Sequence, residues 1–185
     1  MNSLVPLVDT MLGALTILAQ VASLGLILAI ISKGKILGAY KDTIEKNILW
    51  VGFVVSLIAT SGSLFFSEVA GYTPCILCWY QRILMYPQTI LFLVAIIRKD
   101  RGIIPYALAL SIIGGVIAIY HYYGQVAATG ILPCSALGYA ASCSTRFTLQ
   151  YGYITIPMMA FSAFLLIALA SLASRGKKDY SSPKS

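Results

Sequence analysis

The sequence is 185 residues long, 59% hydrophobic and only 10% charged, and its formal net charge is +7. This composition is too apolar for an ordinary soluble domain and indicates an integral membrane protein. The basic residues lie in short turns beside apolar runs. We therefore interpret the charge as a sign of membrane topology and exclude a nucleic-acid-binding surface.

Five apolar segments are long enough to cross a membrane as helices. A bilayer core about 30 Å thick requires roughly 20 apolar helical residues. The sequence therefore predicts an all-α membrane protein, in which a four-helix transmembrane bundle follows one additional N-terminal transmembrane helix. The predicted spans are 7–32, 47–66, 78–97, 103–123 and 151–173.

The chain divides into three parts on this basis. Residues 1–46 hold the additional helix and a cytoplasmic loop, residues 47–174 hold the four-helix bundle, and residues 175–185 form a polar tail that we expect to be disordered. No Lys or Arg precedes the first span, and its apolar stretch is longer than that of a signal peptide. We therefore expect the first span to be retained in the protein.

The basic residues predict the orientation of the bundle. Eleven of the thirteen Lys and Arg residues lie between spans one and two, between spans three and four, or after span five. The two exceptions are Arg82 and Arg146. The positive-inside rule makes these segments cytoplasmic, with the N-terminus outside and the C-terminus in the cytoplasm. The cysteines then lie at the extracytoplasmic side, where disulfides persist.

The first cysteine pair stands at the start of the third span, in "CILCWYQR". Cys75 and Cys78 have the CxxC spacing that is typical of redox-active pairs. Pro74 suits the start of a helix, where unpaired N–H groups and the helix dipole stabilise a thiolate. From this position and the nearby Arg82, we predict a lowered pKa for Cys78.

The second pair, Cys134 and Cys143, lies in the longer outer loop within "PCSALGYAASCS". Glycine and serine make this loop flexible, so the two pairs can exchange disulfides if the loops meet. The residues alone leave three interpretations open. They are a thiol–disulfide relay, two structural disulfides, and a zinc site made of four thiolates, for which the second spacing is wide.

Polar residues at the same membrane level suggest an electron acceptor. Arg82 follows Cys78 by one helical turn. A charge at this depth costs free energy unless it is paired or snorkels to the interface, so Arg82 is a candidate functional residue, with an interfacial snorkelling arginine as the alternative. His121 and Gln125 share one face near the outer end of the fourth span, although interfacial residues gather there anyway. A quinone head group would accept electrons, tolerate apolar walls and use a cation to stabilise its reduced form.

With these motifs, the sequence resembles the disulfide bond formation protein B (DsbB) family, especially its short type C members. The resemblance covers residues 47–173 and rests on "PCILCWYQR", "YHYYGQ", "PCSALGYAASCS" and "YGYITIP", in that order. The family is a four-helix transmembrane bundle in a prokaryotic cell membrane. It reoxidises an extracytoplasmic thioredoxin-like dithiol oxidase and passes the electrons to ubiquinone or menaquinone.

The resemblance also implies roles for the cysteines. The partner's thiolate would attack Cys134, Cys143 would exchange with Cys75, and Cys78 would lie against the quinone. Arg82 resembles the arginine that stabilises the quinone, His121 matches a histidine near it, and we add Gln125 to this expected quinone site.

Two features separate the chain from related patterns. The first span is additional to the four-helix core, and we assign it no role beyond packing. Vitamin K epoxide reductases also couple a CxxC pair to a quinone, but their loop cysteines precede the CxxC pair, whereas Cys134 and Cys143 follow it here. A non-enzymatic membrane scaffold with structural disulfides is the other alternative.

Overall fold

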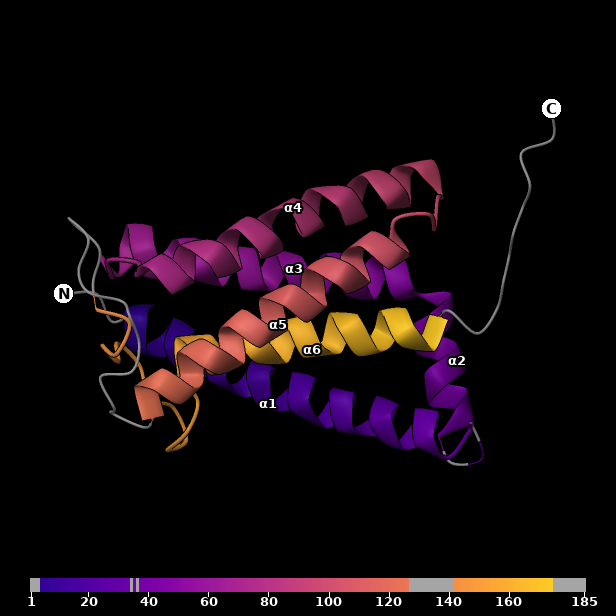
Figure 1. The fold of residues 1–185 in the computed structure, drawn as a ribbon, viewed down its shortest axis with the longest axis horizontal. Coiled ribbons are helices and arrows are strands. Elements are labelled where there is room, and N and C mark those ends of the chain that lie inside the picture. The colour runs from indigo at the N-terminus through magenta and orange to yellow at the C-terminus, as the bar shows by residue number, and fades with distance from the viewer. Residues whose placement is uncertain (1–3, 34, 36, 127–141, 175–185) are drawn as a thin grey trace.

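The computed structural model describes residues 4–33, 35, 37–126 and 142–174, and these residues form helices joined by short turns (Figure 1). The predictions for Cys134 and for the tail 175–185 lie outside this range. The elements in chain order are α1 (Leu4–Ile31), α2 (Gly38–Lys46), α3 (Ile48–Leu64), the π-helical turn η1 (Phe65–Val69), α4 (Ile76–Arg98), α5 (Ile104–Val126) and α6 (Ile156–Ser174).

Five of the described helices are long and apolar enough to cross a membrane, namely α1, α3 together with η1, α4, α5 and α6. The all-α, multi-pass membrane fold is therefore confirmed. Four spans agree with the predicted ranges to within three residues at each end.

The start of the last span and the short helix α2 differ from the prediction. The chain at 151–155 makes a turn, in which Tyr151 and Gly152 have positive φ and Gln150 pairs with Ile154. Helix α6 therefore begins at Ile156, later than the apolar composition suggested. Helix α2 is too short and polar to show a membrane signal, and it lies across one end of the bundle (Figure 1).

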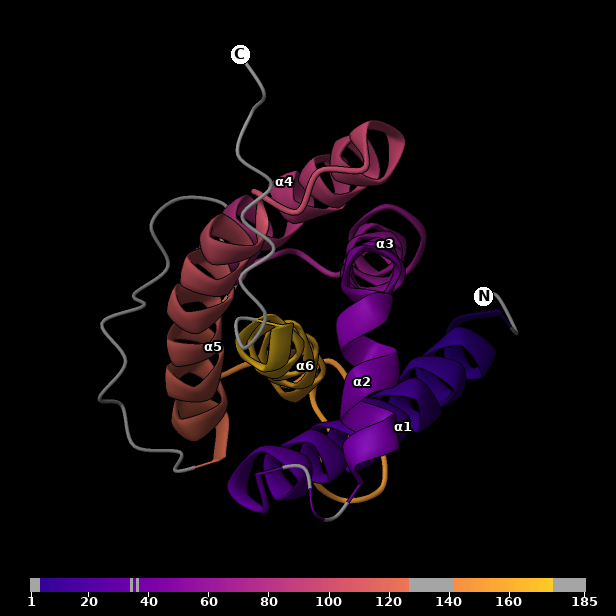
Figure 2. The same ribbon diagram turned by 90° about the vertical axis from the view of Figure 1, so that its right-hand side faces the viewer.

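Helix α6 occupies the centre of the bundle, and the other spans surround it (Figure 2). Within its most apolar window 56% of the residues are buried, against 22% for α1. Glycines allow close packing of the neighbouring helices. A Cβ atom at Gly114 of α5 would lie 2.4 Å from the Phe164 ring of α6, and one at Gly52 of α3 would lie 2.3 Å from the Phe92 ring of α4.

Polar contacts dock α1 against α6 and the turn that precedes it. The Gln150 side chain donates a hydrogen bond of 2.6 Å to the Asp9 carboxylate. Deeper in the bundle, Gln20 accepts a bond from the Tyr153 hydroxyl (2.8 Å) and donates to the Ser162 hydroxyl (3.1 Å). In a bilayer such bonds help to hold helices together, because lipid is as apolar as the helix surface.

Candidate functional site

The site begins at the first turn of α4, where Cys75 is the N-cap residue. Its backbone is extended, with φ −78° and ψ 171°, and its sulfur accepts the backbone N–H of Cys78 at 3.3 Å. This contact uses one of the N–H groups that a helix start leaves unpaired. The sulfur atoms of Cys75 and Cys78 are 2.8 Å apart, and both are free thiols. The CxxC spacing thus brings both thiols to one point at the helix entrance.

The surroundings of Cys75 favour its thiolate. The hydrogen bond from the Cys78 thiol is the largest influence, and His121 adds a second hydrogen bond. Together they lower the pKa of Cys75 to about 4, although burial acts in the opposite direction. The sequence pattern instead predicts a lowered pKa for Cys78. The structure gives the lowered pKa to Cys75, because the sulfur of this N-cap residue accepts the hydrogen bonds from Cys78 and His121.

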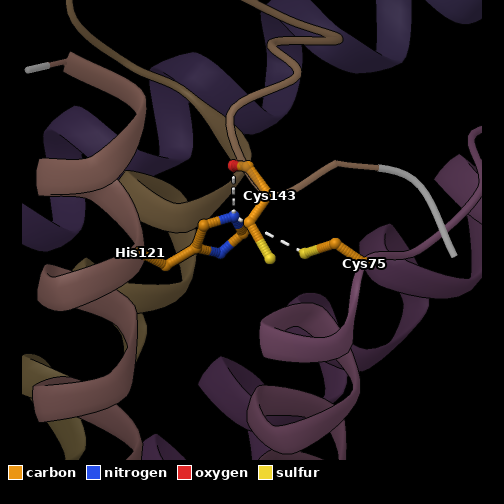
Figure 3. A group of neighbouring side chains, drawn as sticks. All are labelled: Cys75, His121 and Cys143. Carbon is orange, nitrogen blue, oxygen red and sulfur yellow. Dashed lines mark hydrogen bonds between the residues drawn. The ribbon is translucent and has the colours of Figure 1, made fainter. Parts of the chain in front are cut away.

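His121 of α5 connects the two cysteine-bearing segments (Figure 3). Its Nε2 atom lies 3.2 Å from the carbonyl oxygen of Cys143 and 3.6 Å from the sulfur of Cys75. On the other side of the ring, the Gln81 amide lies 3.0 Å from Nδ1 and donates to it. Since a carbonyl only accepts, Nε2 carries the proton, and Gln81 stabilises this tautomer. The buried imidazole therefore directs an N–H group at Cys75.

Cys143 approaches the CxxC pair from the segment that precedes α6. The sulfur of Cys143, the sulfur of Cys75 and a ring nitrogen of His121 all lie within 4.8 Å of one another (Figure 3). Cys143 is part of a disulfide, and the predicted pairing with Cys134 lies outside the described residues. A disulfide sulfur is not a thiolate ligand, so in this state Cys143 does not complete a zinc site. The arrangement suits thiol–disulfide exchange.

A cavity of about 370 Å³ opens beside the CxxC pair. Cys78, Arg82 and His121 border it at the cysteine-bearing end of the bundle, and its remaining walls are mostly apolar side chains of α1, α3, α4 and α6. Its volume is in the range of small-molecule ligand pockets, which combine apolar walls with a few polar groups. The cavity thus suits an apolar ligand that carries a polar group at the cysteine-bearing end.

Contacts with α3 and α4 hold Arg82 beside the cavity. Its Nε and Nη2 atoms donate to the Ser63 hydroxyl and carbonyl, both at 3.0 Å, and the Tyr86 hydroxyl donates to the same Ser63 hydroxyl. The guanidinium carbon also lies 5.3 Å from the centre of the Trp79 ring. In the described part of the chain, no carboxylate lies within ion-pairing distance of Arg82. The guanidinium charge therefore lacks a carboxylate partner there.

Gln125 has a different environment from the other predicted site residues. Its side chain donates a hydrogen bond of 3.0 Å to the carbonyl of Thr145, and its backbone carbonyl accepts bonds from the Arg146 guanidinium. Arg146 thereby satisfies a carbonyl in the last turn of α5, where a positive charge is favourable. Gln125 does not line the large cavity, and its contacts hold the Cys143 segment against α5.

An aromatic stack lines the cysteine-bearing end of the cavity. Phe66 of η1 stacks on Tyr72, and Tyr72 stacks on Phe147, with ring centres 5.8 and 4.8 Å apart. All three residues line the cavity. The stack therefore links the end of α3, the loop before Cys75 and the segment after Cys143.

Two residues of the site were not recognised in the sequence. Gln81 orients His121, and Ser63 holds Arg82. The signal for Gln81 was the same as that for Arg82, a polar side chain inside an apolar span next to the CxxC pair. Ser63 gave no such signal, because serine in a membrane helix commonly bonds to its own backbone.

Comparisons with known proteins agree with the motifs. The model of the family described as "Disulfide bond formation protein DsbB" matches residues 45–174. "Disulfide bond formation protein C" of Bacillus subtilis is 42% identical over 133 residues, which cover 71% of this chain and 94% of that protein. A "Probable disulfide formation protein" of Metapseudomonas resinovorans is 37% identical, over 70% of this chain and 90% of its own length. No solved structure matches the chain.

Proposed function

The chain belongs to the disulfide bond formation protein DsbB family and is a membrane oxidoreductase of disulfide bond formation; from this premise we propose that it is a thiol:quinone oxidoreductase. In this proposal it reoxidises an extracytoplasmic thioredoxin-like dithiol oxidase. The electrons pass through Cys134 and Cys143 to Cys75 and Cys78, and then to a membrane quinone.

One observation carries the proposal: the two thiols of the CxxC pair face different surroundings. Cys75 lies next to the sulfur of Cys143 and to His121, whereas Cys78 borders the apolar cavity together with Arg82. A pair that only stapled two segments would need neither contact. This division supports a relay that takes electrons from one side and delivers them on the other.

The thiol steps balance as exchanges of two electrons. The partner's dithiol reduces the disulfide between Cys134 and Cys143 and leaves as a disulfide. The Cys143 thiolate then attacks the sulfur of Cys75 in the oxidised CxxC pair, and the Cys78 thiolate leaves. Attack by Cys134 on Cys143 restores the loop disulfide and releases Cys75 as a thiolate. The resulting state, with Cys75 and Cys78 free and Cys143 in a disulfide, is the one described above.

The cavity residues suit the last transfer. A quinone would supply an acceptor for two electrons. The reduced pair, with Cys75 as thiolate and one proton on Cys78, closes to a disulfide as it gives up two electrons and that proton, and the second proton of the quinol comes from solvent. Arg82 offers a positive charge that no neighbouring carboxylate neutralises within the described residues, so it favours negative charge developing in the cavity. The mostly apolar walls and the aromatic rings that line the cavity suit the apolar part of such a molecule.

The decisive experiment combines the purified chain, a reduced thioredoxin-like partner and a quinone, and follows quinol by absorbance. We expect the unchanged protein to form quinol, and we expect Cys78→Ala to abolish its formation. The same variant retains the loop disulfide of Cys143, so it should still form a mixed disulfide with the partner, which gel electrophoresis detects. Equal quinol formation by Cys78→Ala and the unchanged protein would contradict the proposed path.

A further inference from the structure

Helix α1 stands outside the part of the chain that matches the family, yet it lines the cavity. The family model begins at residue 45, and the Bacillus subtilis relative is matched over 94% of its length. Too little of that relative remains for another span of about 20 residues. In this chain, Leu12, Leu15, Ala19 and Ala22 of α1 border the same cavity as Cys78 and Arg82. A wall made by α1 is therefore a feature of this chain that its matched core does not supply.

We propose that α1 forms the binding surface for the isoprenoid tail of the quinone. This inference rests on the proposed function, because it assigns the remaining volume of the same cavity. The polar groups lie where α4 begins, and the α1 wall is apolar except for Thr16, whose hydroxyl is satisfied by its own helix through the Leu12 carbonyl (2.8 Å). A ligand with a redox-active head and a hydrocarbon tail matches this distribution.

The wall runs in the direction that a tail must take. From Leu12 to Ala22 the helix advances about 15 Å at 1.5 Å per residue, which is half of a bilayer core about 30 Å thick. The cavity therefore follows α1 from the level of the cysteines toward the middle of the membrane. A quinone head beside Cys78 would thus direct its tail along α1 and into the acyl chains.

The position of α1 is fixed by the contacts that dock it. The hydrogen bonds from Gln150 to Asp9 and from Tyr153 to Gln20 lie on either side of Leu12, Leu15 and Thr16 in the α1 sequence. Ala19 and Ala22 have short side chains and border the cavity. A larger side chain at either position would occupy the tail's volume and leave the head site near Cys78 unchanged.

The test compares quinones that share a head group but differ in the tail. Full-length protein receives Ala19→Leu, and Ala14→Leu serves as the matched control, because Ala14 is exposed on α1 and does not line the cavity. We expect Ala19→Leu to raise KM for a quinone with an isoprenoid tail about tenfold. The KM for the tail-less quinone and the rate of disulfide exchange with the partner should not change, and Ala14→Leu should behave like the unchanged protein.

Each outcome separates the two proposals. If Ala19→Leu raises KM for both quinones equally, or for neither, the assignment of α1 is wrong while the proposed function stands. If the unchanged protein forms no quinol with either quinone, the proposed function fails, and this inference fails with it. Unchanged disulfide exchange shows that a variant is folded, and Ala22→Leu repeats the test if Ala19→Leu does not fold.

Discussion

Replacing His121 with Phe should raise the pKa of the Cys75 thiol. The substitution keeps an aromatic ring in the buried position but removes the Nε2–H group that lies 3.6 Å from the Cys75 sulfur. A hydrogen bond to a charged group is worth about 1.5–3 kcal/mol, which corresponds to roughly 1–2 pKa units. The pKa of Cys75, about 4 in the unchanged protein, should therefore rise by roughly this amount. The hydrogen bond from Cys78 remains and keeps it below the ordinary thiol value.

The ultraviolet absorbance of the thiolate measures this shift in protein whose CxxC pair is reduced. In the unchanged protein the thiolate absorbance should persist as the pH falls from neutrality and disappear near pH 4. The reason is that a thiol with this lowered pKa stays deprotonated at any higher pH. In His121→Phe it should disappear at a pH about 1–2 units higher. Loss of the transition in Cys75→Ser assigns it to Cys75. An unchanged midpoint in His121→Phe would refute the role given to the imidazole.

Three further predictions follow from the contacts. Arg82→Gln should lower kcat/KM for the quinone about tenfold to hundredfold and leave the disulfide-exchange rate unchanged, and an equal loss in both assays would contradict its assignment. Cys78→Ala should raise the pKa of Cys75 by more than His121→Phe in the same absorbance titration, because the Cys78 bond is the larger influence. Gly114→Ala should destabilise the bundle by about 1–3 kcal/mol in thermal unfolding, because its Cβ would overlap Phe164. Gly115→Ala, with its nearest contact at 3.8 Å, is the control, and equal effects would argue against the overlap.

The spans could be predicted from the sequence, but their positions in the bundle could not. Both α1 and α6 are strongly apolar, with mean hydropathies of 2.4 and 2.2, yet α6 is central and α1 faces lipid over much of its surface. Lipid and protein interior are equally apolar, so hydropathy does not distinguish them. Packing depends instead on shape, for example on Gly114 receiving the Phe164 ring.

The sequence could predict the part of the site that lies on a single helix. Cys75, Cys78 and Arg82 lie within two turns, and helical spacing alone brings the last two to the same cavity. The contacts between helices were not predictable, because periodicity carries no information on which helices are neighbours. Gln81 reaching His121 and Ser63 holding Arg82 are such contacts.

The geometry also supports the proposed function, in which one CxxC pair serves both disulfide exchange and electron transfer to a quinone. As the N-cap, Cys75 precedes the helix and faces the loop that brings Cys143, where a stabilised thiolate suits exchange with a disulfide. Cys78 lies within the first turn and borders the cavity, at the level where Arg82 supplies a positive charge. If the two residues exchanged roles, the thiol that reacts with the loop disulfide would lack the His121 contact, and the thiol that serves the cavity would not border it beside Arg82. In the proposed function, the three-residue offset at a helix start places one thiol beside the Cys143 disulfide and the other beside the cavity, while the sulfur atoms stay 2.8 Å apart.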